Sequence, residues 1–316
     1  MALLEVKNIS KNIEGNIIID DISFEQQALQ KIAIAGESGS GKTTLLKMIS
    51  GHAQPTSGKI LFDGKRVIGP DEKLLPGHKQ VAYLSQHYEL LNNYRVEELI
   101  WFENKLSEED AIKLFEICKI DHLLKRRTSQ LSGGEKQRIS LCMLLIRQPK
   151  MLVLDEPFSN LDPIHTNTLK DVLNDIAERL SITCLLTSHD PHDTLSWADK
   201  ILVMKGGKVI QQGSPQEIYY KPTNEYVAGM FGKYNLLSPA LAALFSIESN
   251  GNDVMTRPEN FRIHKTGTGV NGTINKINFE GNFYEAEVLI NDEKIFVITS
   301  NKELMKGEKV FVSVNK

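Results

Sequence analysis

The chain is poor in cysteine and contains no long apolar run. Its 316 residues include only three cysteines, Cys118, Cys142 and Cys184, which are widely spaced and form no CxxC pair. This arrangement excludes a disulfide framework and a zinc site, so we expect three small buried apolar residues. No segment approaches the roughly 20 apolar residues needed to span a bilayer, and the start MALLEVKNIS lacks the apolar run of a signal peptide. We therefore expect a soluble protein made in the cytoplasm.

The chain also lacks a large excess of positive or negative charge. The formal net charge is −3 and is spread over both halves, so no basic field is available to hold a nucleic-acid backbone. With 41% hydrophobic and 24% charged residues, neither disorder nor a collagen-like structure is indicated. A chain of this length buries one large core or two smaller ones, and we expect two domains.

What the sequence does contain is an alternation of strand-like and helix-like pieces from residue 30 to residue 205. Short runs rich in Val, Ile and Leu, typical of buried parallel strands, occur at Lys31–Ala35, Gln80–Ser85, Met151–Asp155, Ile182–Thr187 and Lys200–Met204. Three helix starts, each an N-cap residue followed by proline, occur at Asp162–Pro163, Asp190–Pro191 and Ser214–Pro215. This layout predicts an α/β fold with helices packed on a mostly parallel sheet.

Two further regions complete the first predicted domain, residues 1–234. Leu3–Ile9, Ile17–Phe24 and Lys59–Asp63 are expected to form a small antiparallel sheet beside the parallel one. Residues 92–130 carry no strand signal and predict a helical insert, within a helical subdomain of about residues 87–148.

The pattern changes after residue 234. In Tyr284–Ile290 every second residue is apolar, which places Glu285 and Glu287 on the opposite face of a strand. Asn291 and Asp292 then predict a turn into another strand. Residues 235–316 are therefore expected to form a second domain, a small antiparallel barrel or sandwich.

A glycine-rich loop follows the first predicted parallel strand and opens a predicted helix. In this context GESGSGKT predicts a phosphate-binding loop rather than an ordinary strand-to-helix turn. Glycines allow successive backbone N–H groups to face the phosphates, Lys42 neutralises the outer phosphates, and the Thr43 hydroxyl is suited to ligate Mg²⁺. The predicted nucleotide-binding residues of this loop are Gly36, Glu37, Ser38, Gly39, Ser40, Gly41, Lys42, Thr43 and Thr44.

Polar residues end three other predicted strands. Asp155 and Glu156 close MLVL, where Asp155 is suited to hold Mg²⁺ and Glu156 to polarise the attacking water as a general base. His189 ends the strand that should lie beside MLVLD, and we expect it to touch the γ-phosphate or its water. Gln86 ends QVAYLS at the same edge, where its amide is placed to coordinate Mg²⁺.

The segment LSGGEKQR predicts a second anion site. Ser132 and Glu135 form a capping box, so a helix begins at Gly133 with its positive end exposed. Two glycines in the first turn, Gly133 and Gly134, cost roughly 1 kcal/mol each against alanine. A helix with only a structural role would be more stable without these glycines. Their presence suggests that a ligand approaches the backbone closely.

Taken together, these residues resemble a known family. GESGSGKT, Gln86, LSGGEKQR, MLVLDEP, SNLD at Ser159–Asp162 and His189 are similar, in order, to the P-loop, Q-loop, signature, magnesium-binding strand, D-loop and switch histidine of ABC transporter ATPase subunits. The resemblance covers residues 1 to about 234. It implies that two copies meet head to tail, so that Ser132 and Gly134 of one close on the ATP held by Gly36–Thr44 of the other.

The C-terminal segment refines this resemblance. Met255–Ile263 contains RPEN at Arg257–Asn260 and resembles the TOBE domain of importer ATPases that serve polyamine, ferric iron, sulfate, molybdate and maltose uptake. The family usually stacks an aromatic residue on adenine, whereas Ile13 aligns with that position here, which predicts weak selection between ATP and GTP.

The sequence thus predicts an ATPase subunit that uses ATP and Mg²⁺ to power solute import. It is expected on the inner face of the cell membrane, with permease subunits and, indirectly, a solute-binding protein as partners. A non-transport protein that acts on ribosomes or DNA, and an exporter subunit, are the alternatives. One cassette without a basic linker disfavours the first, and the C-terminal domain disfavours the second. Ferric iron or a polyamine is the expected solute.

Overall fold

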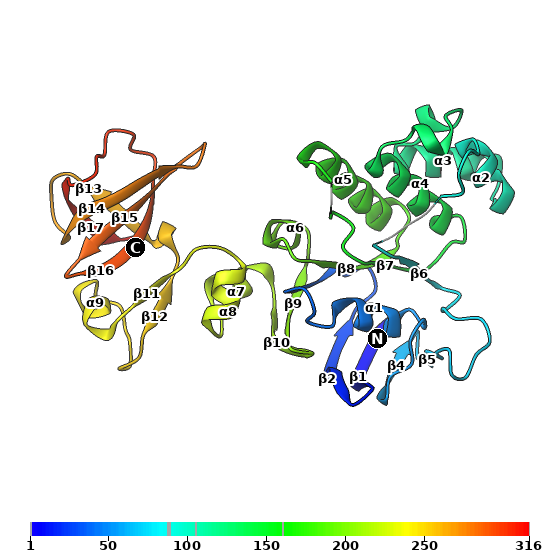
Figure 1. Ribbon diagram of the computed structural model, residues 1–316, viewed down its shortest axis with the longest axis horizontal. Helices are drawn as coiled ribbons and strands as arrows, with labels where there is room; N and C mark the ends of the chain where they lie inside the picture. Colours follow the sequence, from blue (N-terminus) through cyan, green and yellow to red (C-terminus); the bar gives the residue numbers. More distant parts are fainter. Residues whose placement is uncertain (1, 87–89, 105, 160, 316) are drawn as a thin grey trace. The chain divides into compact units, whose positions relative to one another are not determined.

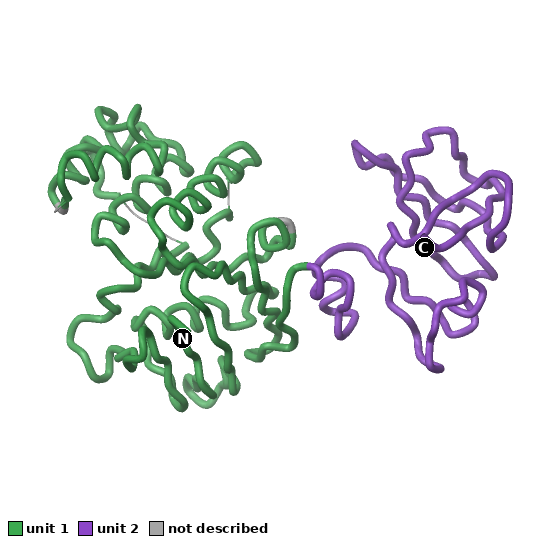
Figure 2. Tube along the Cα trace, turned by 180° about the vertical axis from the view of Figure 1, so that it is seen from behind, with its two compact units in different colours: residues 1–215 green, residues 216–316 purple. Residues whose placement is uncertain are grey.

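The computed structural model contains two compact units, residues 1–215 and 216–316 (Figures 1 and 2). It describes residues 2–86, 90–104, 106–159 and 161–315. Residues 87–89 and 105 of the predicted helical subdomain, and Asn160 of the SNLD segment, lie outside the described residues. The sequence-based division after residue 234 stays a prediction.

A six-stranded sheet forms the centre of the first unit, in the order β10-β9-β3-β8-β7-β6. Five of its strands are parallel, as the apolar runs predict: β3 (Ile32–Gly36), β6 (Val81–Leu84), β7 (Met151–Leu154), β8 (Thr183–Ser188) and β9 (Lys200–Lys205). The sixth, β10 (Lys208–Gly213), is an antiparallel edge strand that the sequence analysis does not predict. The α/β fold class is confirmed.

A four-stranded antiparallel sheet lies beside it, in the order β2-β1-β4-β5. Its strands are β1 (Leu4–Ile13), β2 (Asn16–Gln26), β4 (Ser57–Phe62) and the short β5 (Lys65–Arg66). Leu4, Val6 and Phe62 from this sheet join Ile32 and Ile34 of β3 in one buried core. The predicted small antiparallel sheet is therefore confirmed, with β5 as an addition.

Helices cover the parallel sheet and fill the insert between β6 and β7 (Figure 1). They are α1 (Lys42–Ile49), α2 (Val96–Glu103), α3 (Glu108–Cys118), α4 (Gly133–Leu145), α5 (Pro163–Arg179) and α6 (Pro191–Leu195), with 3-10 turns η1 (Asp121–Leu123) and η2 (Thr128–Gln130). Helices α4, α5 and α6 begin where the sequence analysis expects helix starts. The three cysteines are buried and free, as expected.

The second unit begins with two short helices and ends in a β domain. Helices α7 (Pro215–Tyr220) and α8 (Glu225–Met230) precede the hairpin of β11 (Asn235–Leu237) and β12 (Val254–Thr256), with α9 (Pro239–Leu244) between its strands. A five-stranded antiparallel sheet follows, in the order β13-β17-β14-β15-β16. Its strands are β13 (Phe261–His264), β14 (Val270–Phe279), β15 (Tyr284–Ile290), β16 (Glu293–Thr299) and β17 (Lys309–Val314), after the 3-10 turn η3 (Pro258–Asn260).

Alternation along β15 places its apolar side chains in this second core. Ala286, Val288 and Ile290 are fully or almost fully buried, and Asn291 and Asp292 turn the chain with left-handed φ values of 48° and 67°. The predicted separate β domain is confirmed.

Arg257 of the RPEN segment holds the start of this unit together. Its Nη1 donates to the carbonyl oxygens of Ala228, Gly232 and Lys233 at 2.9, 3.1 and 3.0 Å, and its Nε donates to the Tyr219 carbonyl at 2.9 Å. The guanidinium also lies over the Tyr219 ring, 4.1 Å from its centroid. RPEN therefore has a structural role here.

Within the described residues, no helix is both long and apolar enough to cross a bilayer.

Candidate active site

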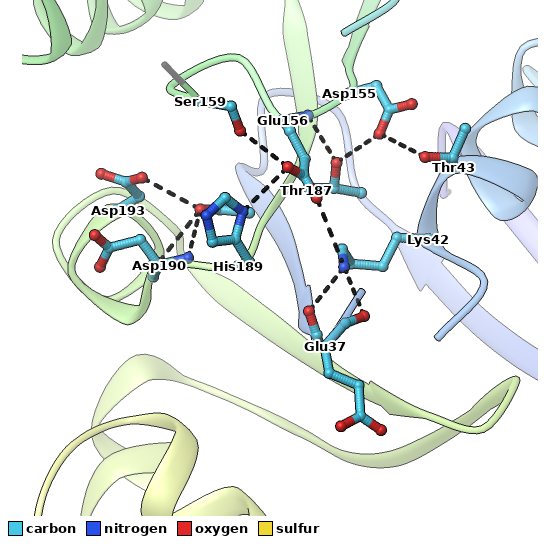
Figure 3. Close-up of polar contacts among 12 residues, drawn as sticks. Glu37, Lys42, Thr43, Asp155, Glu156, Ser159, Thr187, His189, Asp190 and Asp193 are labelled. Carbon is cyan, nitrogen blue, oxygen red and sulfur yellow. Dashed lines mark hydrogen bonds and ion pairs between the residues drawn. The ribbon is translucent and has the colours of Figure 1, made fainter. Parts of the chain in front are cut away.

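The order of the parallel strands brings the predicted functional residues to one edge of the sheet. Strands β3, β8, β7 and β6 are neighbours, and the carboxyl ends of parallel strands meet at the same edge. The glycine-rich loop, His189, Asp155–Glu156 and Gln86 follow these four strands respectively. Figure 3 shows the polar contacts that result.

The glycine-rich loop wraps the buried amine of Lys42. Its Nζ donates to the carbonyl oxygens of Gly36 at 2.7 Å and Glu37 at 3.0 Å. Gly36 has no room for a side chain, since a Cβ would lie 2.5 Å from the Met204 carbonyl oxygen. Gly41 at the N-terminus of α1 has a φ of 99°, a left-handed value that favours glycine. The local fold therefore depends on these glycines.

A cavity of about 370 Å³ opens beside this loop and is lined by Ile18, Ser38, Gly39, Gly41, Lys42, Thr43, Thr44, Gln86 and Glu156. Burial lowers the pKa of the Lys42 ammonium, although the charges of Glu156 and Asp155 act in the opposite direction. A buried ammonium gains from an anionic partner. The cavity thus combines a helix N-terminus and a desolvated cation, which suits phosphate groups.

Asp155 is almost completely buried, and three hydroxyl groups hold its carboxylate. Thr43 and Thr187 donate to Oδ1 at 3.1 and 3.0 Å, and Tyr83 donates to Oδ2 at 3.0 Å. Tyr83 and Thr187 belong to no motif and are not predicted from the sequence. The available signal was a hydroxyl within each apolar strand next to β7, because β6 and β8 both pair with β7.

Glu156 lies between the other two predicted catalytic residues. Its Oε2 accepts a hydrogen bond from Ser159 Oγ at 2.9 Å and lies 3.1 Å from Nδ1 of His189. Its Oε1 lies 3.8 Å from Lys42 Nζ. The backbone at Glu156 has a left-handed φ of 47°, which is uncommon outside glycine and occurs often at functional sites. Glu156, His189 and Lys42 are therefore brought together.

The capped helix start predicted for the segment LSGGEKQR is present. Ser132 Oγ accepts from the Glu135 backbone N–H at 3.3 Å, and Glu135 Oε2 accepts from the Ser132 N–H at 2.7 Å, so the capping box at the start of α4 is present. Arg126 adds an ion pair to Glu135 Oε1 at 3.0 Å. Burial acts to raise the pKa of Glu135, but the hydrogen bonds from Ser132 and the charge of Arg126 outweigh it, and the pKa is lowered.

Gly133 and Gly134 have different surroundings. Among the described residues, apart from its chain neighbours and its own helix, a Cβ at Gly133 would meet no atom within 4 Å, which leaves room for a ligand. A Cβ at Gly134 would lie 2.9 Å from Cδ2 of His165, so contact within the chain is enough to require glycine there. His165 Nδ1 in turn lies 2.6 Å from Oδ2 of Asp162, the N-cap residue of α5. His165 is not predicted from the sequence. Its contact with Gly134 joins residues far apart in the chain, and its contact with Asp162 resembles an ordinary helix cap.

Neither Ile13 nor the signature segment lines the phosphate cavity described above. Ile13, at the end of β1, is 47% exposed, and Ile18 is the aliphatic residue among those that line the cavity. Ser132, Gly133 and Gly134 also lie outside that lining, taken over the described residues. The chain thus carries the two predicted phosphate-contacting elements in separate places.

Comparisons with known proteins show which proteins this chain is similar to. A family model described as ABC transporter matches residues 19–159. The spermidine/putrescine import ATP-binding protein PotA of Spiroplasma citri is 31% identical over 99% of this chain and 95% of its own length. The putrescine transport ATP-binding protein PotG of Escherichia coli strain K12 is 35% identical over 76% of this chain and 64% of its own. Among solved structures, cbiO1 from Clostridium perfringens, part of the ABC transporter complex cbiONQ, aligns with a TM-score of 0.62 and 28% identity over 69% of this chain and 90% of that chain.

Proposed function

Because this chain belongs to the ABC transporter family as an ATP-binding subunit, we propose that it hydrolyses ATP to energise import of a solute across the cytoplasmic membrane. The similarity to PotA over nearly the whole chain confirms the resemblance drawn from the six motifs. One observation carries the catalytic part of the proposal: Glu156, His189 and Lys42 converge beside the phosphate cavity.

Lys42 and the backbone N–H groups of the glycine-rich loop bind the outer phosphates of ATP. Glu156 accepts the proton of the attacking water, and His189, which contacts the same carboxylate, orients that water and the γ-phosphate. Thr43 and Asp155 fit Mg²⁺, because a hydroxyl and a carboxylate oxygen meet there at 3.1 Å and Mg²⁺ prefers oxygen ligands. Gln86, which lines the same cavity, adds an amide oxygen. When bound, the metal neutralises charge on the transferred phosphate.

Two copies of the chain form the working unit in this proposal. Ser132, Gly133 and Gly134 offer a capped helix start but lie outside the lining of their own chain's cavity. A second copy arranged head to tail brings this element to the γ-phosphate. Shifting a transporter between two states from 1:99 to 99:1 takes about 5.5 kcal/mol, so two ATP molecules need supply only about 3 kcal/mol each.

The membrane partners are permease subunits, with a solute-binding protein acting through them. Exposed apolar side chains support a docking surface on the first unit, because such residues mark interaction sites when they gather. Leu75 lines a second cavity of about 410 Å³ together with Pro76, Leu144 and Pro149, and Leu74 beside it is 97% exposed. We place the chain on the inner face of the membrane through this contact. No nucleic-acid partner is proposed.

The solute is proposed to be a polyamine, since the relatives named above carry spermidine and putrescine in their names. Deletion of the chain should abolish uptake of radiolabelled spermidine or putrescine by cells, and the wild-type chain should restore it. Copurification should recover permease subunits. Recovery of ribosomes without permease would contradict the transport function, whereas normal polyamine uptake with failed uptake of another solute would contradict only the choice of solute.

A further inference from the structure

The hydroxyl of Tyr83 is hydrogen-bonded to one of the two carboxylate oxygens of Asp155, which is buried at the active site. It lies in the middle of β6 and is paired in register with Val153 of β7. Its hydroxyl donates to Asp155 Oδ2 at 3.0 Å, while Thr43 and Thr187 hold Oδ1. Both oxygens of the carboxylate are therefore held, and Oδ1 is the oxygen that meets the Thr43 hydroxyl at the proposed metal site.

The Tyr83 ring packs against His52, in the turn that follows α1. Its centroid lies 5.3 Å from that of the His52 ring, at an interplanar angle of 39°. His52 Nδ1 lies 2.9 Å from Ser50 Oγ, and Ser50 Oγ donates to the Leu46 carbonyl oxygen at 2.9 Å. Lys42 and Thr43 begin the same helix. The Tyr83 hydroxyl thus connects Asp155 to the packing around the helix that carries the phosphate-binding residues.

In the hydrogen bond between Tyr83 and Asp155, the donor and the acceptor are fixed by the two groups. The phenol hydroxyl donates and the carboxylate accepts, because an ionised carboxylate offers only acceptors. A charged acceptor makes such a hydrogen bond stronger than a neutral pair, so the contact is able to fix the orientation of the carboxylate.

We propose that Tyr83 is a positioning residue for the metal-binding carboxylate of Asp155, and that its hydroxyl sets the affinity of the site for Mg²⁺. The inference rests on the proposed function, because it takes Thr43 and Asp155 as the residues that hold the metal. Groups that orient a metal-binding carboxylate are worth about 10-fold to 100-fold in metal affinity.

Tyr83→Phe tests the proposal, since it removes the hydroxyl and keeps the ring against His52. Binding of a fluorescent ATP analogue is titrated with Mg²⁺ and, separately, measured in EDTA. The variant should need about 10-fold more Mg²⁺ for half-maximal response, with metal-free nucleotide affinity unchanged. Tyr234→Phe is the matched control, because Tyr234 also donates to a carboxylate, Glu225 Oε2 at 2.7 Å, in the second unit. It should leave the Mg²⁺ titration as in the parent.

Two further variants separate the possible failures. Asp155→Asn should abolish the Mg²⁺ response, and adding Tyr83→Phe to it should change nothing more, since the two residues act as one. If Asp155→Asn responds to Mg²⁺ like the parent, the metal site in the proposed function is wrong. If Asp155→Asn loses the response while Tyr83→Phe keeps the parental titration, the metal site stands and the role of Tyr83 is refuted. Thermal unfolding in EDTA verifies that each variant is folded.

Discussion

Ser159 Oγ donates a 2.9 Å hydrogen bond to Oε2 of Glu156, the oxygen that also faces the imidazole of His189. Ser159 opens the SNLD segment, which leads directly into α5. The proposed general base is therefore tied to the segment that resembles the D-loop of the family. Movement of that segment should change the position of the base.

Replacing the proposed base should separate nucleotide binding from hydrolysis. Glu156→Gln keeps the shape of the side chain but cannot accept the water proton, so ATPase activity should fall by a factor of about 100 or more. The variant should accumulate as an ATP-bound dimer, visible by size-exclusion chromatography with light scattering. Glu178→Gln, at an exposed position of α5, is the control and should retain activity. Hydrolysis at the parental rate by Glu156→Gln would refute the catalytic assignment.

Mixing two inactive variants should restore part of the activity. Ser132→Arg places a long cation where the partner's ATP must close, and Lys42→Ala removes the phosphate-binding amine. A mixed dimer carries one composite site in which both residues are intact, so mixing should yield ATPase activity that neither variant has alone. Full activity of Ser132→Arg by itself would contradict closure by the signature segment.

Acid should weaken the capping box at the start of α4. The pKa of Glu135 is lowered in the folded chain from its ordinary value of 4.5, so the folded state binds fewer protons than the unfolded state. The resulting stabilisation is present above pH 4.5 and is lost as the pH falls through the folded-state pKa. Denaturant unfolding measured as the pH falls from 6 to well below 4.5 should show this loss only below pH 4.5. Glu135→Gln should flatten it while lowering stability at pH 6 by about 1 kcal/mol. An unchanged pH slope in the variant would count against the contribution.

Nucleotide selection should be weak. Ile13 aligns with the position at which the family stacks an aromatic residue, and Ile18 lines the phosphate cavity. The base should therefore gain little from stacking, and kcat/KM for GTP should lie within about tenfold of that for ATP. Ile13→Tyr should strengthen binding of both nucleotides, because stacking on an aromatic ring contributes about 1 to 3 kcal/mol. Ile17→Tyr, at a neighbouring position that is 63% exposed, controls for the added ring. A strong preference of the parent for ATP in steady-state kinetics would contradict the prediction.

The second unit should depend on the guanidinium of Arg257. Arg257→Lys cannot reproduce four hydrogen bonds from two nitrogens and should destabilise residues 216–316 by about 3 kcal/mol, since a hydrogen bond to a charged group contributes about 1.5 to 3 kcal/mol. Hydrogen exchange followed by mass spectrometry should show faster exchange in α8 and β12. The same change at the exposed Arg262 should have no such effect.

The part of the fold predicted correctly is the part that local patterns encode. Strands such as β7 and β8 are buried on both faces and therefore appear as continuous apolar runs, and the helix starts at Asp162 and Ser132 carry their own caps. In contrast, β10 is a polar edge strand with mostly half-buried residues, which no periodicity marks. Its place follows only from pairing with β9.

The same distinction applies to the site. Site residues that belong to short motifs can be predicted from the sequence. Tyr83 and His165 cannot, because folding alone brings them next to Asp155 and Gly134. Glu285 shows the limit of alternation, because it lies on the polar face of β15 yet is buried in an ion pair with Lys233. Long-range pairing of this kind leaves no trace in the spacing of residues.

Because Gly134 and His165 are in contact, a larger side chain at one position requires a smaller one at the other. Any side chain at 134 needs the space that the imidazole fills, so Gly134→Ala should be tolerated better when His165 is shortened to Ala or Ser than when it is retained. In related sequences, the two positions should covary in size. A change in the helix after SNLD would then decide which residues the signature tolerates, even though the two segments belong to different motifs.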